Sequence, residues 1–423
     1  MAGGRGFGQG KGANATRRYL RLFRRQCIPQ TRSAARSVTH EETFILPAPK
    51  TCPRKESVPG TDSAVACPRF LPQRFQVACT MFLHALSTAV PSLSLTQAEC
   101  WDLIDRSPAR QRLHRRSRLI LHSVLRGDHG IERRHFAVGN LESVFELTPD
   151  ELNTAFRAEA PRLAGQALTR AMGAAGVRPD QIDALLICTC TGYLCPGVTS
   201  YVSENLGLRT DAYLQDLVGL GCGAAIPTLR AASHVLAARP DATVACVAVE
   251  ICSAAFYLDD DPGVLISACL FGDGAAASIW RGSPGPSGLR AFDFTTHHQP
   301  ADRDKLRFEM RNGKLRNLLD RTVPELASGA VARLWEKRGV RPVSRVVAHA
   351  GGIDVLGALA GVLPGHSLEA SANVLRNCGN MSSPSVLFAL EETLRTTFPG
   401  ADGDFWLVSF GAGFSAHSCR LGV

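Results

Sequence analysis

The stretch Leu-Val-Gly-Leu-Gly-Cys-Gly-Ala-Ala, residues 217–225, predicts a strand that turns sharply into a helix. An apolar run enters it, glycines surround Cys222, and a helix-forming run follows from Ala224 to Ala238. A thiol at a helix N-terminus lies at the positive end of the helix dipole, which favours the thiolate. The glycines let a substrate carbonyl approach and leave backbone N–H groups free to bind an oxyanion. Cys222 is therefore a candidate nucleophile.

Two polar residues later in the chain could complete such a site. His349 ends an apolar run and precedes Ala-Gly-Gly, and Asn380 lies in Cys-Gly-Asn-Met-Ser-Ser, residues 378–383. Active-site groups of α/β folds lie in this setting, at strand ends beside glycine. A Cys/His/Asn set can activate a thiolate, hold an acyl thioester and stabilise an enolate. Each residue alone is more often structural, and it is their shared setting that favours a site.

Strand-like and helix-like segments alternate along residues 81–423, which predicts an α/β fold around a largely buried sheet. The predicted strands are residues 184–189, 243–250, 275–280, 345–349 and 405–410. The predicted helices are residues 155–175, 224–238, 324–338 and 383–397. Residues 271–280 align with residues 410–419 as a weak internal repeat, with four of ten positions identical. It indicates two related halves, which we place at 81–285 and 286–423.

Composition and charge exclude several classes of protein. Hydrophobic residues make up 45% and charged residues 20% of the chain, which is ordinary for a globular protein. No apolar run of about 18 residues predicts a membrane span. The net charge of +9 comes from residues 1–80, which hold 14 basic and four acidic residues, whereas the rest is close to neutral. The body of the chain therefore does not indicate nucleic-acid binding.

The cysteines and one acidic run have ordinary interpretations. The 14 cysteines lack the spacing of a disulfide framework, and we expect free thiols in a reducing cytoplasm. Cys188, Cys190 and Cys195 could bind zinc, but no second ligand pair is spaced to match, so small thiols lining a pocket are preferred. Asp259-Asp260-Asp261, directly before Pro262, predicts a solvated turn rather than a metal site.

The glycine-rich segments resemble those of the type III polyketide synthases, the chalcone and stilbene synthase family, from about residue 81 to the C-terminus. The segments that carry the resemblance are Gly-Leu-Gly-Cys at 219–222, His-Ala-Gly-Gly at 349–352, Gly-Asn-Met-Ser-Ser at 379–383, Leu-Phe-Gly-Asp-Gly-Ala-Ala-Ala at 270–277 and Phe-Gly-Ala-Gly at 410–413. The resemblance implies a thiolase-like fold of two related α/β halves in five layers, αβαβα. It also implies a homodimer that uses no metal, cofactor or acyl carrier protein.

The family's chemistry carries over by position. The resemblance implies that Cys222 takes an acyl group from a coenzyme A starter. His349 and Asn380 would bind malonyl-CoA, promote its decarboxylation and stabilise the enolate that attacks the acyl-cysteine. Repeated extension and cyclisation would release a pyrone, resorcinol or chalcone type of product. The starter and the number of extensions stay open.

The resemblance also implies a substrate pocket, with some departures from the family. Its residues are Phe256 as gatekeeper, Cys190, Thr191, Cys195, Ser382, Gly411, Ala412 and Gly413. Ala412 replaces a frequent proline, and Cys195 replaces a methionine that reaches the partner subunit's pocket in plant enzymes. No phenylalanine in residues 313–324 matches a second gatekeeper. The family's basic coenzyme A residues do not map here, and Arg118 and Arg126 are nearby candidates.

Two other functions compete with this one. The ketoacyl-carrier-protein synthases III share the fold and the Cys/His/Asn set. Their histidine is typically followed by a run ending in Ala-Asn and their asparagine by Thr-Ser, whereas His-Ala-Gly-Gly and Asn-Met-Ser-Ser occur here. A catalytically silent scaffold of the same fold is the third possibility, and the three intact positions argue against it.

Residues 1–80 form a basic leader without hydrophobic periodicity, and three interpretations of it are open. One is a start codon assigned too early, because Met81 opens a segment that resembles the family's usual N-terminus. The second is a disordered tail. The third is a transit peptide, which an Arg-rich, acid-poor start favours.

Overall fold

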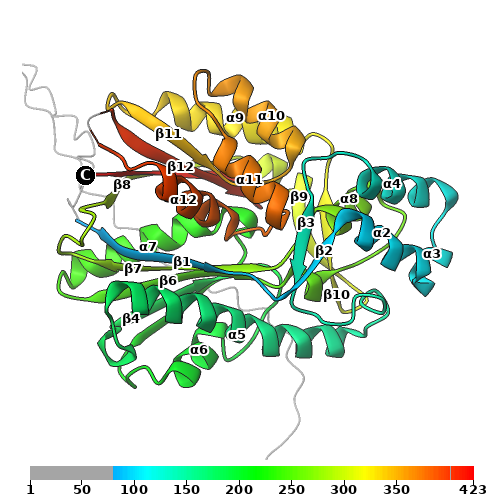
Figure 1. The fold of residues 1–423 in the computed structure, drawn as a ribbon, viewed down its shortest axis with the longest axis horizontal. Helices are drawn as coiled ribbons and strands as arrows, with labels where there is room; N and C mark the ends of the chain where they lie inside the picture. The colour runs from blue at the N-terminus through cyan, green and yellow to red at the C-terminus, as the bar shows by residue number, and fades with distance from the viewer. Residues whose placement is uncertain (1–79, 401) are drawn as a thin grey trace, which may run out of the picture. The chain divides into compact units, whose positions relative to one another are not determined.

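The computed structural model describes residues 80–400 and 402–423, so the predictions about the leader lie outside the described residues. Nine strands follow the order β11-β12-β13-β8-β1-β7-β6-β4-β5. A single register pair, Phe82 with Arg290, joins β1 to β8. The strands therefore divide at this point into two sheets, which Figure 1 shows one above the other.

Each sheet contains an antiparallel strand at an equivalent place. The first sheet consists of β1 (Phe82–Ala89), β4 (Ala184–Cys188), β5 (Tyr213–Leu217), β6 (Thr243–Glu250) and β7 (Gly274–Arg281). The second consists of β8 (Arg290–His298), β11 (Val343–Ala348), β12 (Asp404–Gly411) and β13 (Ser415–Gly422). β7 runs antiparallel between β1 and β6, as β13 does between β8 and β12. The two segments of the internal repeat run into β7 and β13, so the repeat reflects a duplicated strand position.

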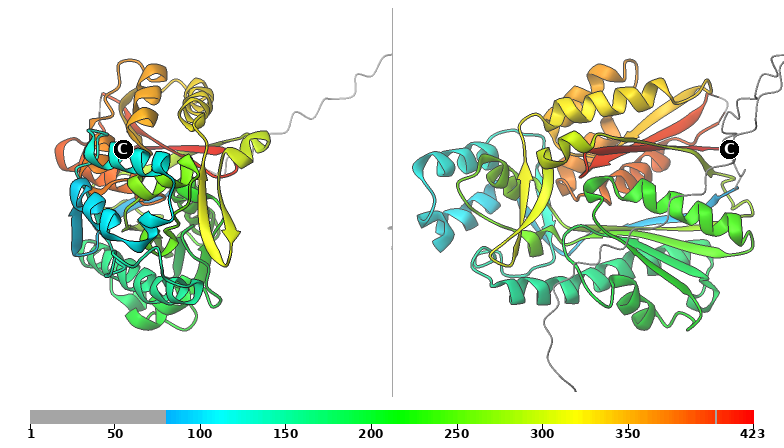
Figure 2. Two further views of the ribbon diagram at one scale, coloured as in Figure 1. Left: turned by 90° about the vertical axis from the view of Figure 1, so that its right-hand side faces the viewer. Right: turned by 180° about the vertical axis from the view of Figure 1, so that it is seen from behind.

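Helices fill the three layers around the two sheets (Figures 1 and 2). The outer helices of the first sheet are α5 (Pro149–Ala175) and α6 (Val198–Leu206), and those of the second are α9 (Val323–Glu336) and α10 (Ile353–Val362). Between the sheets lie α7 (Ala225–Ala238), α11 (Glu369–Cys378) and α12 (Ser385–Thr396). Three clusters of buried hydrophobic residues lie between these layers. The fold is the predicted five-layered, thiolase-like α/β arrangement.

The predicted elements are found with small shifts at their ends. The strand predicted at 243–250 has these bounds, and α5 extends the helix predicted at 155–175 toward the N-terminus. Thr148 and Glu151 form a capping box at its start, and Gly176 ends it with a left-handed φ of 62°. Local capping chemistry, rather than hydrophobic periodicity, therefore fixes where this helix begins.

The remaining elements form a cap at the right of Figure 1. They are β2 (Leu93–Thr96), α2 (Gln97–Arg106), α3 (Pro108–Gln111), α4 (Arg115–Arg126), β3 (Arg133–Phe136), α8 (Pro262–Leu270) and the ribbon β9 (Leu306–Arg311) with β10 (Lys314–Leu319). Among the helices of the described residues, none is long and apolar enough to cross a membrane.

The predicted turn at Asp259-Asp260-Asp261 is present, but its side chains are half-buried rather than solvated. Asp261 caps α8 by accepting from two backbone N–H groups, and Asp260 accepts from the hydroxyl of Ser117. Asp259 accepts from Arg316 of β10. These residues are polar because they bind neighbouring elements. Partners so distant along the chain cannot be recognised from the adjacent sequence.

Candidate active site

Cys222 lies at the end of a sharp turn that leads into α7, as predicted. It occupies a 3₁₀ turn, Gly221–Gly223, and is 8% exposed. A Cβ on Gly221 would lie 2.9 Å from the backbone nitrogen of Ala412, and one on Gly411 would lie 2.6 Å from that of Gly223. The glycines therefore let the turn after β12 pack directly against the backbone of the nucleophile.

His349 directly follows β11, a strand of the second sheet. Its backbone N–H donates to the carbonyl of Val408 at 2.9 Å, and its ring meets the ring of Phe410 edge-on at 5.2 Å. Its Nδ1 is buried and has no hydrogen-bond partner among the described residues. A buried nitrogen without a partner marks a place where a substrate group could bind.

Asn380 is held beside the segment that carries His349. Its side-chain amide donates to the carbonyl of Gly351 at 2.9 Å, and its side-chain oxygen accepts from the backbone of Ser382 at 2.8 Å. Its backbone carbonyl also accepts from Gly272 at 3.0 Å, which fixes the residue from a third side. An amide carries two N–H donors, so one hydrogen remains for a substrate oxygen.

Ser382 connects Cys222 to Asn380. Its hydroxyl donates to Cys222 Sγ at 3.2 Å and lies 3.2 Å from Cys190 Sγ. It has a φ of 60°, a conformation that costs energy for a residue other than glycine. The contacts run from Cys222 through Ser382 and Asn380 to the segment of His349. The structure thus brings together all three residues singled out in the sequence.

Burial governs the charges of the site. It raises the pKa of the Cys222 thiol to about 12 and lowers the pKa of His349 to about 3. Both groups are therefore neutral in the free protein at neutral pH. The position at the helix N-terminus does not make Cys222 a thiolate in this state, because the loss of water around the sulfur raises the pKa of its thiol. A nucleophilic role for Cys222 requires that it lose its proton when a substrate binds, and a neutral imidazole can accept it.

We expect the alkylation of Cys222 by iodoacetamide to accelerate by about tenfold per pH unit from about pH 6 to about pH 10, because only the thiolate reacts. The rate is measured from the mass of the Cys222 peptide after timed quenching. A rate already constant between about pH 6 and pH 8 would contradict the neutral pair and indicate a Cys–His ion pair instead.

A buried carboxylate that sequence reasoning missed supports the pocket. Glu250 ends β6 and accepts from the backbone N–H groups of Cys190 and Thr191 at 2.9 and 3.1 Å. It also accepts from the hydroxyl of Ser383 at 2.6 Å, and burial raises its pKa. Glu250 thus fixes the end of β4 against the Asn380 turn. An acid that ends a wholly apolar strand was the available signal.

A cavity of about 620 Å³ lies beside the Cys222 turn and is lined by Gly219 and Gly221. Of the predicted pocket residues, Cys190, Thr191 and Ala412 line it. Phe256 lines an adjoining pocket with Phe271 and Phe308 and stacks on Phe145 at 5.9 Å between ring centroids. Gly411 and Gly413 form the turn beside the cavity, and Cys195 is exposed. Phe271 and Phe308 were not singled out in the sequence.

The two candidate coenzyme A residues lie on α4, outside these cavity walls. Arg126 is ion-paired with Asp102, and Arg118 is half-buried. Both lie in the cap, on the helix that packs against α2 and α8. Their role in binding stays a prediction.

Comparisons with known proteins agree with this geometry. Residues 139–286 match the model of the FAE1/Type III polyketide synthase-like protein family. The chain is 29% identical over 309 residues to 1,3,6,8-tetrahydroxynaphthalene synthase of Streptomyces peucetius subsp. caesius, which covers 69% of this chain and 81% of the relative. It is 30% identical to 3,5-dihydroxyphenylacetyl-CoA synthase of Amycolatopsis balhimycina, over 56% of this chain and 68% of that one.

Comparison with solved structures also identifies a type III polyketide synthase as similar to this chain. The crystal structure of 1,3,6,8-tetrahydroxynaphthalene synthase from Streptomyces coelicolor A3(2), a bacterial type III polyketide synthase, matches with a TM-score of 0.72 and 27% identity. The match covers 81% of this chain and 98% of that one. The ketoacyl-carrier-protein synthase alternative gains no support from these comparisons.

Proposed function

Because this chain belongs to the type III polyketide synthase family, we propose that Cys222, His349 and Asn380 carry its chemistry. The acyl group of a coenzyme A starter is transferred to Cys222, whose thiol gives its proton to His349, and His349 passes that proton to the departing coenzyme A thiolate. The free Asn380 N–H and His349 then bind the thioester oxygen of malonyl-CoA, which loses CO₂ to leave an enolate. The enolate attacks the acyl-cysteine, and the cycle repeats before cyclisation. The contact chain from Cys222 to the His349 segment supports this assignment most directly.

The product proposed here is a cyclised polyketide of the pyrone, resorcinol or chalcone type. The names of the relatives, a tetrahydroxynaphthalene synthase and a dihydroxyphenylacetyl-CoA synthase, favour a polyhydroxylated aromatic ring. Incubation of the full chain with malonyl-CoA, alone and with a panel of acyl-CoA starters, tests this by mass spectrometry. We expect products with several two-carbon units and no need for a carrier protein. A single condensation that requires malonyl-carrier protein would refute the proposal.

The homodimer is also part of the proposal, and the edge strand β5 supports it. Tyr213 and Leu214 on this strand are 51% and 37% exposed, and Val218 just after it is 50% exposed. Such an edge offers unpaired backbone groups and apolar side chains to a second copy.

We expect Leu214→Arg to convert the dimer to a monomer, because it places a charge at the centre of this edge. The mass in solution is measured by size-exclusion chromatography with light scattering. Val340→Arg is the matched control, because Val340 is fully exposed in the turn before β11 and should leave the dimer intact. An unaltered chain that is monomeric at micromolar concentration would disprove the dimer.

The rest of the proposal concerns the setting of the enzyme. Coenzyme A thioesters are substrates, and no metal, bound cofactor, carrier protein, membrane or nucleic acid enters the reaction. We place the enzyme in the cytoplasm, which the ten free thiols of the described residues support. We place the boundary of the two halves in the loop between β7 and β8.

A further inference from the structure

The β9–β10 ribbon presents different residues on its two faces. Its strands pair with each other, and neither belongs to the two main sheets. The cross-strand pair Phe308 and Asn317 lines the pocket beside Phe256. The neighbouring pair, Glu309 and Arg316, must project from the opposite face, because side chains alternate along a strand. An isolated two-stranded ribbon is only marginally stable, so its place beside the cavity depends on what binds this second face.

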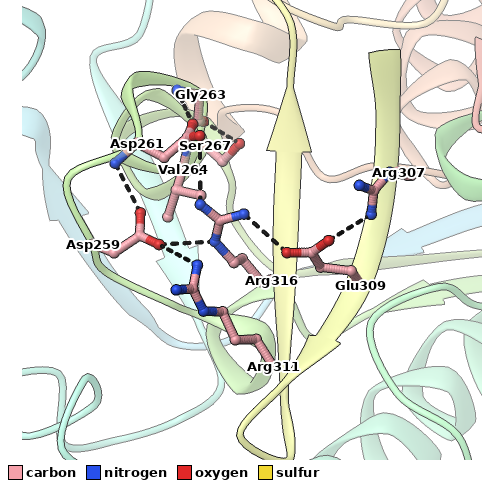
Figure 3. A network of polar contacts seen from close by, with 9 residues as sticks. All are labelled: Asp259, Asp261, Gly263, Val264, Ser267, Arg307, Glu309, Arg311 and Arg316. Carbon is pink, nitrogen blue, oxygen red and sulfur yellow. Dashed lines mark hydrogen bonds and ion pairs between the residues drawn. The ribbon is translucent and has the colours of Figure 1, made fainter. Parts of the chain in front are cut away.

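Arg316 makes the contacts that bind this face (Figure 3). Its side chain is 8% exposed, and its guanidinium contacts Asp259 at 2.8 Å, Glu309 at 3.0 Å and Asp261 at 3.4 Å. Asp259 and Asp261 lie in the segment that joins Phe256 to α8. A planar guanidinium with several fixed donors suits such a set of carboxylates better than a lysine would. Arg316 therefore ties the ribbon to the adjoining wall of the pocket.

The same contacts extend toward the catalytic residues. Asp261 caps α8, and the hydroxyl of Ser267 on that helix, which donates to the Gly263 carbonyl at 2.8 Å, lies 3.2 Å from the side chain of Asn317. The segment after α8 contains Phe271, which lines the pocket, and Gly272, which donates to the carbonyl of Asn380. The ribbon and α8 thus form one wall of the pocket, which ends at the segment beside the Asn380 turn.

We propose that Arg316 is a positioning residue that determines how many extension units the enzyme adds before release. This inference rests on the proposed function. Arg316 holds Phe308 and Asn317 against the space in which the growing chain folds. Without it, the ribbon moves away from α8, water reaches the acyl-cysteine, and the chain leaves early with fewer units. The decarboxylation of malonyl-CoA depends on His349 and Asn380 and does not need this wall.

The test compares the full chain with its Arg316→Met variant on malonyl-CoA and the accepted starter. We expect the ratio of full-length to truncated products to fall by about tenfold, since displacement of a positioning contact by about 1 Å can cost on the order of 10²-fold in rate. Decarboxylation should change by less than about twofold, and hydrogen exchange at residues 306–319 should accelerate. Arg316→Lys keeps the positive charge but lacks the planar set of guanidinium donors, and it should restore the ratio in part.

Arg311→Met is the matched control on the same ribbon. Arg311 lies 3.8 Å from the same Asp259 but its side chain is 54% exposed, so the product ratio should stay that of the unaltered chain. If Arg316→Met does not fold, Glu309→Gln, which removes one charge and keeps the side-chain shape, should shift the ratio in the same direction. An unchanged ratio in a folded variant, or a parallel loss of decarboxylation, would overturn the positioning role. Failure of the unaltered chain to make any polyketide would instead refute the proposed function.

Discussion

Cys222→Ala is expected to abolish polyketide formation, with a loss of about 10⁴-fold or more, because the covalent acyl intermediate can no longer form. Intact-protein mass spectrometry after incubation with an acyl-CoA should find no acyl adduct. Decarboxylation of malonyl-CoA should persist, since the oxygen-binding groups on His349 and Asn380 are untouched. This split separates a lost nucleophile from a lost fold.

Cys190→Ala is the matched comparison, because both sulfurs lie 3.2 Å from the Ser382 hydroxyl. The acyl adduct should remain on Cys222 in this variant. An adduct that survives in Cys222→Ala and disappears in Cys190→Ala would reverse the assignment of the nucleophile. Cys222→Ser tests the chemistry at constant shape and should load far more slowly than cysteine, since a hydroxyl is much the weaker nucleophile.

Asn380→Ala is expected to reduce malonyl-CoA decarboxylation by about 10²- to 10³-fold, as is usual when one donor to a developing oxyanion is removed. His349→Ala should cost at least as much, because it also removes the base for Cys222. The rate is followed as acetyl-CoA released from malonyl-CoA without a starter. Unlike Cys222→Ala, both variants should lose decarboxylation and extension together.

His234→Gln is the control for these two variants. His234 lies on α7, the helix that begins at the nucleophile, yet it is exposed. Its replacement should leave both rates close to those of the unaltered chain. Decarboxylation that survives in Asn380→Ala would mean that another donor stabilises the enolate.

The candidate site could be predicted because each of its three residues has a local sign in the sequence. Cys222, His349 and Asn380 all lie beside glycines at the ends of apolar segments, and the backbone approaches at Gly221 and Gly411 explain why glycine is needed there. The α/β pattern was likewise local. The equivalence of β7 and β13 in the two halves could also be predicted, because short identical segments mark both strands.

What could not be predicted depends on long-range contacts. Phe308 and Arg316 act through a ribbon whose place is fixed by carboxylates about fifty residues earlier in the chain. Asp259 appeared solvated because its partner is distant in sequence. The neutral state of Cys222 depends on burial by both halves of the protein. Such burial cannot be predicted from a short segment of sequence. The helix dipole was visible in the sequence, whereas the opposing desolvation was not.

The place of β1 has a consequence for how the protein is made. This strand is the first of the described chain, yet its partner β7 ends at Arg281, and its register pairs Phe82 with that residue. At a synthesis rate of about 5–20 residues per second, β1 emerges from the ribosome roughly 10–40 seconds before its partner exists. Pairing across such a separation in sequence slows folding. The nascent chain therefore carries an unpaired apolar edge through nearly half of translation, so slower growth or chaperone supply should govern its soluble yield.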